Sequence, residues 1–282
     1  MQIHWYPGHM AKTRRLLKEK LKLVDLVIEL ADARIPLSSR NPEFDSLLDN
    51  KPRLLLLTKA DLAEPAVTQS WCIYFQQDGL NAMAVDLLSK SPLHGVIPAV
   101  ESLAEGVMQR LEAAGKLRRP ARAMVAGIPN VGKSQLINKL SGKASVRVEN
   151  RPGVTRGYQW IRLGKQIDLM DSPGMLWPKI EDQQTGFKLA LIGAIPQDIL
   201  DNVELALELL RLLLESYPSR LIERYGIQVE RAATPLLALE MIGRSRGLLK
   251  KGGIVDAKKA AEVLLQEFRT GKLGRFSLEQ KK

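Results

Sequence analysis

The residues with the clearest chemical pattern form the segment Gly127-Ile-Pro-Asn-Val-Gly132-Lys133-Ser134. This spacing of two glycines, a lysine and a serine is typical of a phosphate-binding loop. Glycine lets backbone amides turn toward a phosphate without a clash from a side chain, and the helix that follows adds its dipole. Lys133 would reach the β- and γ-phosphates, and Ser134 would ligate Mg²⁺. The segment, which we call the phosphate loop, therefore predicts a site for a nucleoside triphosphate.

A carboxylate and a glycine follow at a distance that suits such a site. Asp171-Ser-Pro-Gly174 comes 37 residues after Ser134, at the end of an expected strand. Asp171 can hold Mg²⁺ through a water molecule, and the amide of Gly174 can reach the γ-phosphate. The loop at 151–157 lies between these motifs, and its Thr155 is a candidate to complete the Mg²⁺ shell when a nucleoside triphosphate is bound.

A possible base-recognition motif lies earlier in the chain. Thr58-Lys59-Ala60-Asp61 is similar to the guanine-specificity pattern [NT]-K-x-D, with threonine where asparagine is usual. Asp61 would accept hydrogen bonds from N1 and N2 of guanine, which adenine cannot donate in that pattern. The aliphatic stem of Lys59 would cover the base. The motif predicts a preference for guanine nucleotides.

Apolar runs alternate with amphipathic segments along the first 170 residues, which predicts alternating strands and helices. The expected strands lie at 25–31, 53–57, 82–86, 121–126, 160–163 and 166–170. The expected helices lie at 10–24, 42–49, 68–77, 96–114 and 134–140. Such alternation favours an α/β fold, a mostly parallel sheet with helices on both faces, which binds ligands at the carboxyl ends of its strands.

The order of the motifs is unusual, because the base-recognition motif precedes the phosphate loop. An ordinary GTPase has the reverse order, so we expect a circularly permuted P-loop GTPase domain over residues 1–177, with an N-terminal basic extension. The rest of the chain is rich in leucine and alanine, with amphipathic helices expected at 203–224, 235–243 and 256–269. We therefore expect a second, all-helical domain at 178–282.

The charge of the chain is concentrated at its ends. Its 282 residues include 42 Lys and Arg against 31 Asp and Glu. Residues 1–24 carry six basic residues and one acid, and residues 241–282 carry eleven basic residues and four acids. This distribution predicts a polyanionic partner, although basic termini can also be merely solvated. The candidate RNA-binding residues are Lys12, Arg14, Arg15, Lys250, Lys251, Lys258 and Lys259.

Composition excludes several classes of protein. A single cysteine excludes an internal disulfide framework and a multi-cysteine zinc site. The most apolar stretch, residues 205–214, is interrupted by Glu208 and Arg211, so no membrane-spanning segment is expected. The N-terminus lacks the basic and apolar regions of a secretory signal. We expect a cytoplasmic protein.

Taken together, these motifs resemble those of the circularly permuted GTPases of ribosome assembly, over nearly the whole chain. The matching segments are 5–12 (WYPGHMAK), 32–36 (DARIP), 39–42 (SRNP), 59–61 (KAD), 127–134 (GIPNVGKS), 151–155 (RPGVT), 171–174 (DSPG) and 176–179 (LWPK). The resemblance implies a GTP hydrolase that binds the precursor of the large ribosomal subunit in its GTP state and assists late maturation. It also implies that the helical domain contacts ribosomal RNA.

The resemblance further assigns individual residues. Met175 occupies the place where many GTPases have a water-orienting glutamine, and the family uses the histidine of the Pro-Gly-His turn, here His9. Asn130 matches GTPases that bind K⁺ beside the phosphates, so K⁺ is expected to stimulate hydrolysis. The catalytic set is thus His9, Lys133 and Gly174. The expected GTP-binding residues are Thr58, Lys59, Asp61, Asn130, Val131, Gly132, Lys133, Ser134, Gln135 and Gly174.

Two other functions remain open from the sequence. Met175 favours a nucleotide-gated RNA-binding module with little catalysis of its own. A P-loop enzyme that uses ATP on small molecules is a weaker alternative, against which Asp61 argues. The segment Leu87-Leu88-Ser89 is where a fifth GTPase motif should fall, but its residues supply little beyond backbone.

Overall fold

The computed structural model describes residues 15, 17–48, 51–91, 93, 95–142, 160–163, 166–172, 174, 176, 180, 182–196, 199–227 and 234–281. They form two compact units, which we describe separately. The larger unit comprises the described residues of His4–Ile180 together with Phe276–Lys282, and the smaller unit contains those of Glu181–Arg275. Residues 276–282 therefore belong to the larger unit, whereas the expected boundary placed them in the helical domain.

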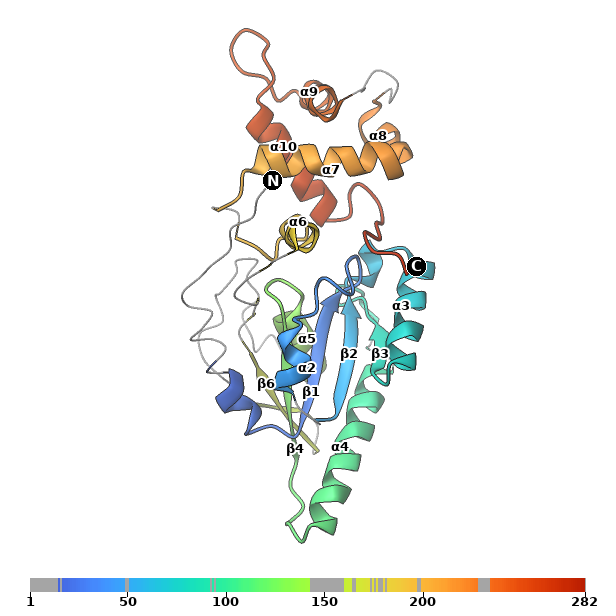
Figure 1. The fold of residues 1–282 in the computed structure, drawn as a ribbon, viewed down its shortest axis with the longest axis vertical. Helices are drawn as coiled ribbons and strands as arrows, with labels where there is room; N and C mark the ends of the chain where they lie inside the picture. The colour runs from blue at the N-terminus through green and yellow to red at the C-terminus, as the bar shows by residue number, and fades with distance from the viewer. Residues whose placement is uncertain are drawn as a thin grey trace. The chain divides into compact units, whose positions relative to one another are not determined.

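A six-stranded sheet forms the centre of the larger unit, in the order β3-β2-β1-β4-β6-β5 (Figure 1). Its strands are β1 (Leu26–Asp32), β2 (Arg53–Thr58), β3 (Asn81–Ala84), β4 (Ala121–Gly127), β5 (Trp160–Leu163) and β6 (Ile167–Asp171). All neighbours pair in parallel except β5, which is antiparallel to β6. This confirms the predicted mostly parallel α/β fold, and every strand lies within two residues of its expected place.

All seven residues of β1 are buried, which shows that both faces of this central strand are covered. Helices of this unit include α2 (Glu43–Leu47), α3 (Pro65–Gln77), α4 (Val96–Ala113) and α5 (Lys133–Ser141), and a short 3₁₀ helix, η1, spans Ala60–Leu62. Residues 15 and 17–21, within the helix expected at 10–24, are also helical. Contacts join α4 to β1, β2 and β4, and α5 to β4, β5 and β6. Trp71, Cys72 and Phe75 of α3 pack with apolar residues of β1 and β2.

The smaller unit is helical, as predicted. It contains α6 (Gln183–Leu191), α7 (Asn202–Ser216), α8 (Pro218–Tyr225), α9 (Pro235–Ser245) and α10 (Ala257–Arg269). The single helix expected at 203–224 is in fact two helices. The break falls before Pro218, which lacks an N–H for the helical ladder and therefore begins α8. Asp201, Thr234 and Asp256 cap the starts of α7, α9 and α10 with side-chain hydrogen bonds.

After α10 the chain returns to the larger unit as an extended segment, Phe276–Lys281, which we call the C-terminal strap. Figure 1 shows this red segment beside α3. The side chain of Phe276 is fully buried, and the indole Nε1 of Trp71 donates to the backbone oxygen of Glu279 at 3.0 Å. The strap is therefore an integral part of the larger unit.

Candidate functional site

The predicted motifs meet at one edge of the sheet, because each follows the carboxyl end of a parallel strand. Strand β2 leads into Thr58-Lys59-Ala60-Asp61, β4 into the phosphate loop, and β6 ends at Asp171. The order of successive strands reverses between β1 and β4, which pair in parallel although they are far apart in sequence. Such a reversal creates the crevice in which open α/β sheets bind nucleotides.

The phosphate loop has a backbone that requires its glycines. Gly127 has φ +155°, and a Cβ atom there would lie 2.7 Å from the backbone oxygen of Leu30. Gly132 has φ +108° and directly precedes α5, while Asn130 adopts the left-handed conformation at φ 59°. Asparagine tolerates this conformation better than most residues. The loop therefore turns its amides at the start of a helix, as an anion site needs.

Lys133 lies inside this loop. Its Nζ donates to the backbone oxygens of Ile128 and Gly127, at 2.7 and 3.2 Å. Burial lowers the pKa of Lys133 to about 8, an effect that the nearby Asp171 carboxylate opposes and Lys59 reinforces. A cation held in this way at a helix start is suited to bind a phosphate, whose negative charge would restore the ordinary pKa.

Gly174 packs directly on the phosphate loop. A Cβ atom at this position would lie 2.7 Å from Cα of Pro129, 2.8 Å from its nitrogen and 3.1 Å from Nζ of Lys133. Only glycine fits so close to a backbone. The structure thus brings the two predicted phosphate-contacting motifs together.

Asp171 and Ser134 form a place that fits Mg²⁺. The Ser134 hydroxyl lies 3.5 Å from Oδ2 of Asp171, and the Asp171 side chain is buried. Burial raises the pKa of Asp171, while Lys133 opposes this shift. Among the described residues, Oδ1 of Asp171 has no hydrogen-bond partner. A buried, unpartnered carboxylate oxygen beside a hydroxyl provides hard oxygen ligands of the kind Mg²⁺ prefers.

Thr58 links the base-recognition motif to the phosphate loop. It is fully buried, and its hydroxyl lies 2.7 Å from the backbone oxygen of Val131 and 3.1 Å from that of Ala31. Threonine thus makes a supporting hydrogen bond although asparagine is usual at this position. Val131, predicted to bind GTP, is itself buried and contributes its carbonyl to this link.

Lys59 is held by an ion-pair network that begins on β1. Its Nζ lies 3.1 Å from Oδ2 of Asp32, which also accepts two side-chain hydrogen bonds from Arg34. Burial disfavours the charge of Asp32, yet Arg34 and Lys59 hold its pKa well below the ordinary value. Burial lowers the pKa of Lys59, and Asp32 opposes this. The network fixes Lys59 with its backbone in the left-handed conformation.

Asp61 lies in η1, two residues after Lys59, and is partly exposed. Burial raises the pKa of Asp61, and the neighbouring Asp86 adds to this shift. Asp86 also accepts hydrogen bonds from the amides of Leu88 and Ser89, so it shapes the loop after β3. The side chain of Leu87 approaches Gly132, since a Cβ atom there would lie 2.9 Å from Leu87 Cδ1. The segment considered for the fifth GTPase motif therefore lies at the same edge.

The structure does not describe all of the predicted residues. His9, Lys12, Arg14, Thr155 and Met175 lie outside the described residues. Gln135 lies in the first turn of α5, and its Oε1 would be 3.4 Å from a Cβ atom at Gly132. The structure thus brings together Thr58, Lys59, Asn130, Val131, Gly132, Lys133, Ser134, Gln135, Asp171 and Gly174, with Asp61 adjacent.

Basic candidates in the smaller unit are exposed. Lys250 and Lys251 lie between α9 and α10, and Lys258 and Lys259 lie in the first turn of α10. Nζ of Lys250 lies 3.7 Å from Oδ1 of Asp256, which is a long distance for an ion pair. In the larger unit, Arg15 is 84% exposed and lies 3.5 Å from Glu19. Their exposure leaves these charges accessible to a polyanion.

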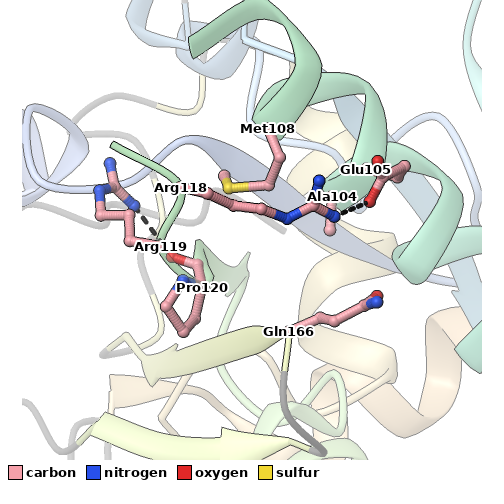
Figure 2. Close-up of a pocket in the computed structure, with 7 residues that line it drawn as sticks. All are labelled: Ala104, Glu105, Met108, Arg118, Arg119, Pro120 and Gln166. Atoms are coloured by element: carbon pink, nitrogen blue, oxygen red, sulfur yellow. Dashed lines mark hydrogen bonds and ion pairs between the residues drawn. The ribbon is translucent and has the colours of Figure 1, made fainter. Parts of the chain in front are cut away.

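A shallow pocket of about 180 Å³ lies away from these motifs. Figure 2 shows its lining, in which Arg118 pairs with Glu105 beside Pro120 and Gln166. Pro120 and Gln166 directly precede β4 and β6, so the pocket lies at the amino ends of the strands. We assign it no part in nucleotide binding, because open α/β sheets bind ligands at the opposite edge.

Sequence patterns missed two contributors to the site. Asp32 and Arg34 form the network around Lys59, and the strap reaches the loops beside it. The Asp32-Ala33-Arg34 segment could have indicated the network around Lys59, because it places two opposite charges at the end of a strand. No local pattern pointed to the strap, which lies more than 200 residues from its partners.

Comparisons with known proteins agree with this geometry. The family model "50S ribosome-binding GTPase" matches residues 122–224. Ribosome biogenesis GTPase A of Priestia megaterium is 46% identical over 280 residues, which cover 99% of this chain and 97% of the relative. Ribosome biogenesis GTPase A of Thermotoga maritima is 32% identical, covering 98% and 94%.

A solved structure is also similar. The crystal structure of GNP-bound YlqF from T. maritima matches with a TM-score of 0.66 and 28% identity, covering 95% of this chain and 98% of that one. The similarity extends across the larger and smaller units. Because the sequence relatives match along almost the whole chain and the structure supplies a P-loop GTPase fold, the chain belongs to the ribosome biogenesis GTPase A family and is a GTP hydrolase.

Proposed function

We propose that this GTPase binds the precursor of the large ribosomal subunit in its GTP state, assists its late maturation, and hydrolyses GTP on release. The observation that carries the proposal is the assembly of Lys133, Asp171 and Gly174 beside a base-recognition loop at one sheet edge. The matched family description and the names of the relatives both refer to ribosomes. We place this work in the cytoplasm, where ribosomal particles are assembled.

The phosphate half of the proposed site would neutralise charge on the transferred phosphoryl group. Lys133, now directed at loop carbonyls, would turn to the β- and γ-phosphates, and the Gly174 amide would donate to the γ-phosphate. Ser134 would ligate Mg²⁺ directly, and Asp171 would hold it through water. When bound, Mg²⁺ supplies charge neutralisation between the phosphates.

Three further assignments complete the proposed mechanism. His9 would accept a hydrogen bond from the attacking water and so position it. Thr155 would complete the Mg²⁺ shell in the GTP form. Asn130, whose left-handed backbone lies in the phosphate loop, would help to bind K⁺ beside the phosphates. The proposed dependence on K⁺ is tested by replacing it with Na⁺, and an unchanged rate of hydrolysis would contradict it.

The exposed lysines of the smaller unit support RNA as the partner surface. Lys250, Lys251, Lys258 and Lys259 carry positive charge from two neighbouring segments, and each phosphate contact adds a salt-dependent contribution to affinity. Lys12, Arg14 and Arg15, in the N-terminal part of the chain, would supply further contacts to RNA phosphates. The alternative of a nucleotide-gated RNA-binding module shares this surface and differs only in lacking turnover.

Sedimentation with ribosomal fractions tests the proposal. The protein should co-sediment with large-subunit precursors in the presence of a non-hydrolysable GTP analogue and be released with GDP. Equal sedimentation in both nucleotide states would contradict a GTP-gated role.

A matched pair of double variants tests the RNA surface. Lys258→Gln with Lys259→Gln should weaken sedimentation and reduce its dependence on salt. Lys90→Gln with Lys116→Gln removes the same charge from exposed positions in the larger unit and should leave sedimentation unchanged. Equal losses in both pairs would reject the assignment of the lysines on α10.

A further inference from the structure

The C-terminal strap forms backbone hydrogen bonds with two separate loops at the nucleotide edge. The amide of Phe276 donates to the oxygen of Leu62 at 2.9 Å, and that of Leu278 donates to the oxygen of Arg34 at 2.9 Å. Leu62 ends η1, which contains Asp61, and Arg34 belongs to the ion-pair network that holds Lys59. The strap thus reaches the loops that carry both proposed base-contacting residues.

Side chains of the strap strengthen these attachments. The hydroxyl of Ser277 accepts a hydrogen bond from the amide of Glu64 at 3.1 Å, just after η1. The carboxylate of Glu279 accepts from the amides of Leu37 and Ser38, at 2.7 and 3.2 Å. It also accepts from the Ser38 hydroxyl. Hydrogen bonds to a carboxylate are stronger than those between neutral groups, so Glu279 holds the turn at 37–38 firmly.

The turn at 37–38 leads directly into Ser39, which holds Asp32 in place. The hydroxyl of Ser39 accepts from the amide of Asp32 at 2.8 Å and donates to the oxygen of Ile35 at 2.6 Å. Asp32 contacts Lys59 and Arg34, as described above. Contacts therefore run from Glu279 through the turn at 37–39 to Asp32 and then to Lys59. Phe276 and Ser277 bond separately to Leu62 and Glu64, at the end of η1 and just after it.

Three residues of the strap are buried. Phe276 is 0% exposed, Ser277 is 3% exposed and Glu279 is 8% exposed. The backbone oxygen of Glu279 is also fixed by Trp71, and Lys281 lies 5.1 Å from the ring of Tyr74. Contacts with Trp71 and Tyr74, both on α3, thus help to determine where the strap lies.

We propose that the C-terminal strap positions the guanine-recognition loop, and that Glu279 is a positioning residue for base specificity. This inference rests on the proposed role of Asp61 in reading guanine. A strap that only anchors the end of the chain would affect overall stability without altering the choice of base. If the strap positions Asp61 and Lys59, variants that weaken it should also change the preference for guanine.

Inosine diphosphate provides the sharpest probe, because hypoxanthine lacks the N2 amine that Asp61 would bind. The experiment measures the dissociation constants of GDP and IDP by titration calorimetry, with the full-length chain. Their ratio is independent of any inactive fraction in the sample. In Glu279→Ala the preference for GDP over IDP should fall by about threefold to tenfold, as expected for losing well-formed hydrogen bonds.

Further variants separate positioning from a general loss of structure. Glu279→Gln keeps one oxygen that can accept from the amides, so most of the preference should return. Ser277→Ala removes one hydrogen bond to Glu64 and should lower the preference by a smaller factor, even if Glu279→Ala does not fold. Glu262→Ala, at an exposed position on α10, is the matched control and should keep the wild-type ratio.

The outcomes distinguish the strap from the base site. If Asp61→Ala loses the preference while Glu279→Ala and Ser277→Ala keep it, the strap proposal is wrong and the role of Asp61 stands. If Asp61→Ala itself keeps the wild-type ratio, Asp61 does not read guanine and both proposals fail. A reduced ratio in Asp61→Ala and in the strap variants, with an unchanged control, supports both.

Discussion

On the phosphate side of the sheet edge, the loop after β4 supplies most of the residues, and Asp171 and Gly174 pack against it. On the base side, the supporting contacts come from three segments: residues 32–39, residues 58–64, which contain the base-recognition motif, and the strap at 276–281. The phosphate side carries a buried lysine beside a buried carboxylate, whereas the base side carries a network of two cations around Asp32.

This difference indicates how each half acts. On the phosphate side, burial lowers the pKa of Lys133. A bound phosphate would stabilise the protonated lysine and raise this pKa again. On the base side, Arg34 and Lys59 stabilise the Asp32 charge, which favours a rigid frame for hydrogen-bond recognition. We therefore expect phosphate-side changes to affect all nucleotides and base-side changes to affect mainly the choice among them.

Removing the lysine of the phosphate loop should have the largest effect. Lys133→Ala should weaken GTP, GDP and ADP together, and lower any hydrolysis by about 100-fold or more, because a charge at the phosphates is lost. Titration calorimetry and a phosphate-release assay measure the two effects. Lys116→Ala, at an exposed position, is the control. A loss confined to guanine nucleotides would contradict the division between the halves.

On the base side, Asp61→Asn should change the identity of the preferred nucleotide. An amide at this position can donate to the 2-oxo group of xanthine, but it no longer accepts both guanine hydrogens. The affinity for GDP should fall by about 10- to 100-fold, while the affinity for xanthosine diphosphate (XDP) rises. Competition between the two nucleotides measures the switch. Unchanged preference for GDP would show that another group reads the base.

The contact between the halves can be tested at Thr58. Thr58→Val keeps the shape of the side chain but removes the hydroxyl that bonds to Val131, so GDP affinity should fall by about fivefold. Thr270→Val is the control, because it removes a hydroxyl that bonds to the backbone oxygen of Gln266 at the end of α10, in the smaller unit. Equal losses of affinity in the two variants would mean that the bond to Val131 has no special role.

The smallest expected effect is a pH dependence of the phosphate side. Lys133 has a lowered pKa of about 8, and phosphates bind its protonated form, so nucleotide binding should take up a proton above that pH. Affinity for GDP should be constant near pH 7 and fall by about fourfold by pH 8.5. Calorimetry in buffers of different ionisation enthalpy would detect the proton uptake. A flat profile to pH 8.5 would contradict the lowered pKa.

The contrast between the halves also explains what the sequence could predict. The phosphate loop is contiguous, and its glycines, Lys133 and Ser134 each have a chemical reason to stand where they do. The buried strands could be predicted equally well, since all of β1 is apolar except Glu29 and Asp32. These features depend on local pattern, which a single chain displays directly.

The base side could be predicted only in part, because its frame depends on contacts that are distant in sequence. Glu279 binds the turn at 37–38 from 242 residues away, and no periodicity or spacing signals such a contact. The Asp32 network was likewise invisible until β1 and β2 were paired in register, Asp32 beside Thr58. The break between α7 and α8 was a different case, in which leucine periodicity concealed the effect of Pro218.

The most direct test of the account is phosphate release from GTP and from ATP, with and without precursors of the large ribosomal subunit. We predict slow release from GTP by the protein alone, acceleration by the particles, and no comparable release from ATP. Release that the particles leave unchanged, or that is equal for ATP, would contradict a ribosome-stimulated GTPase and favour one of the alternative functions.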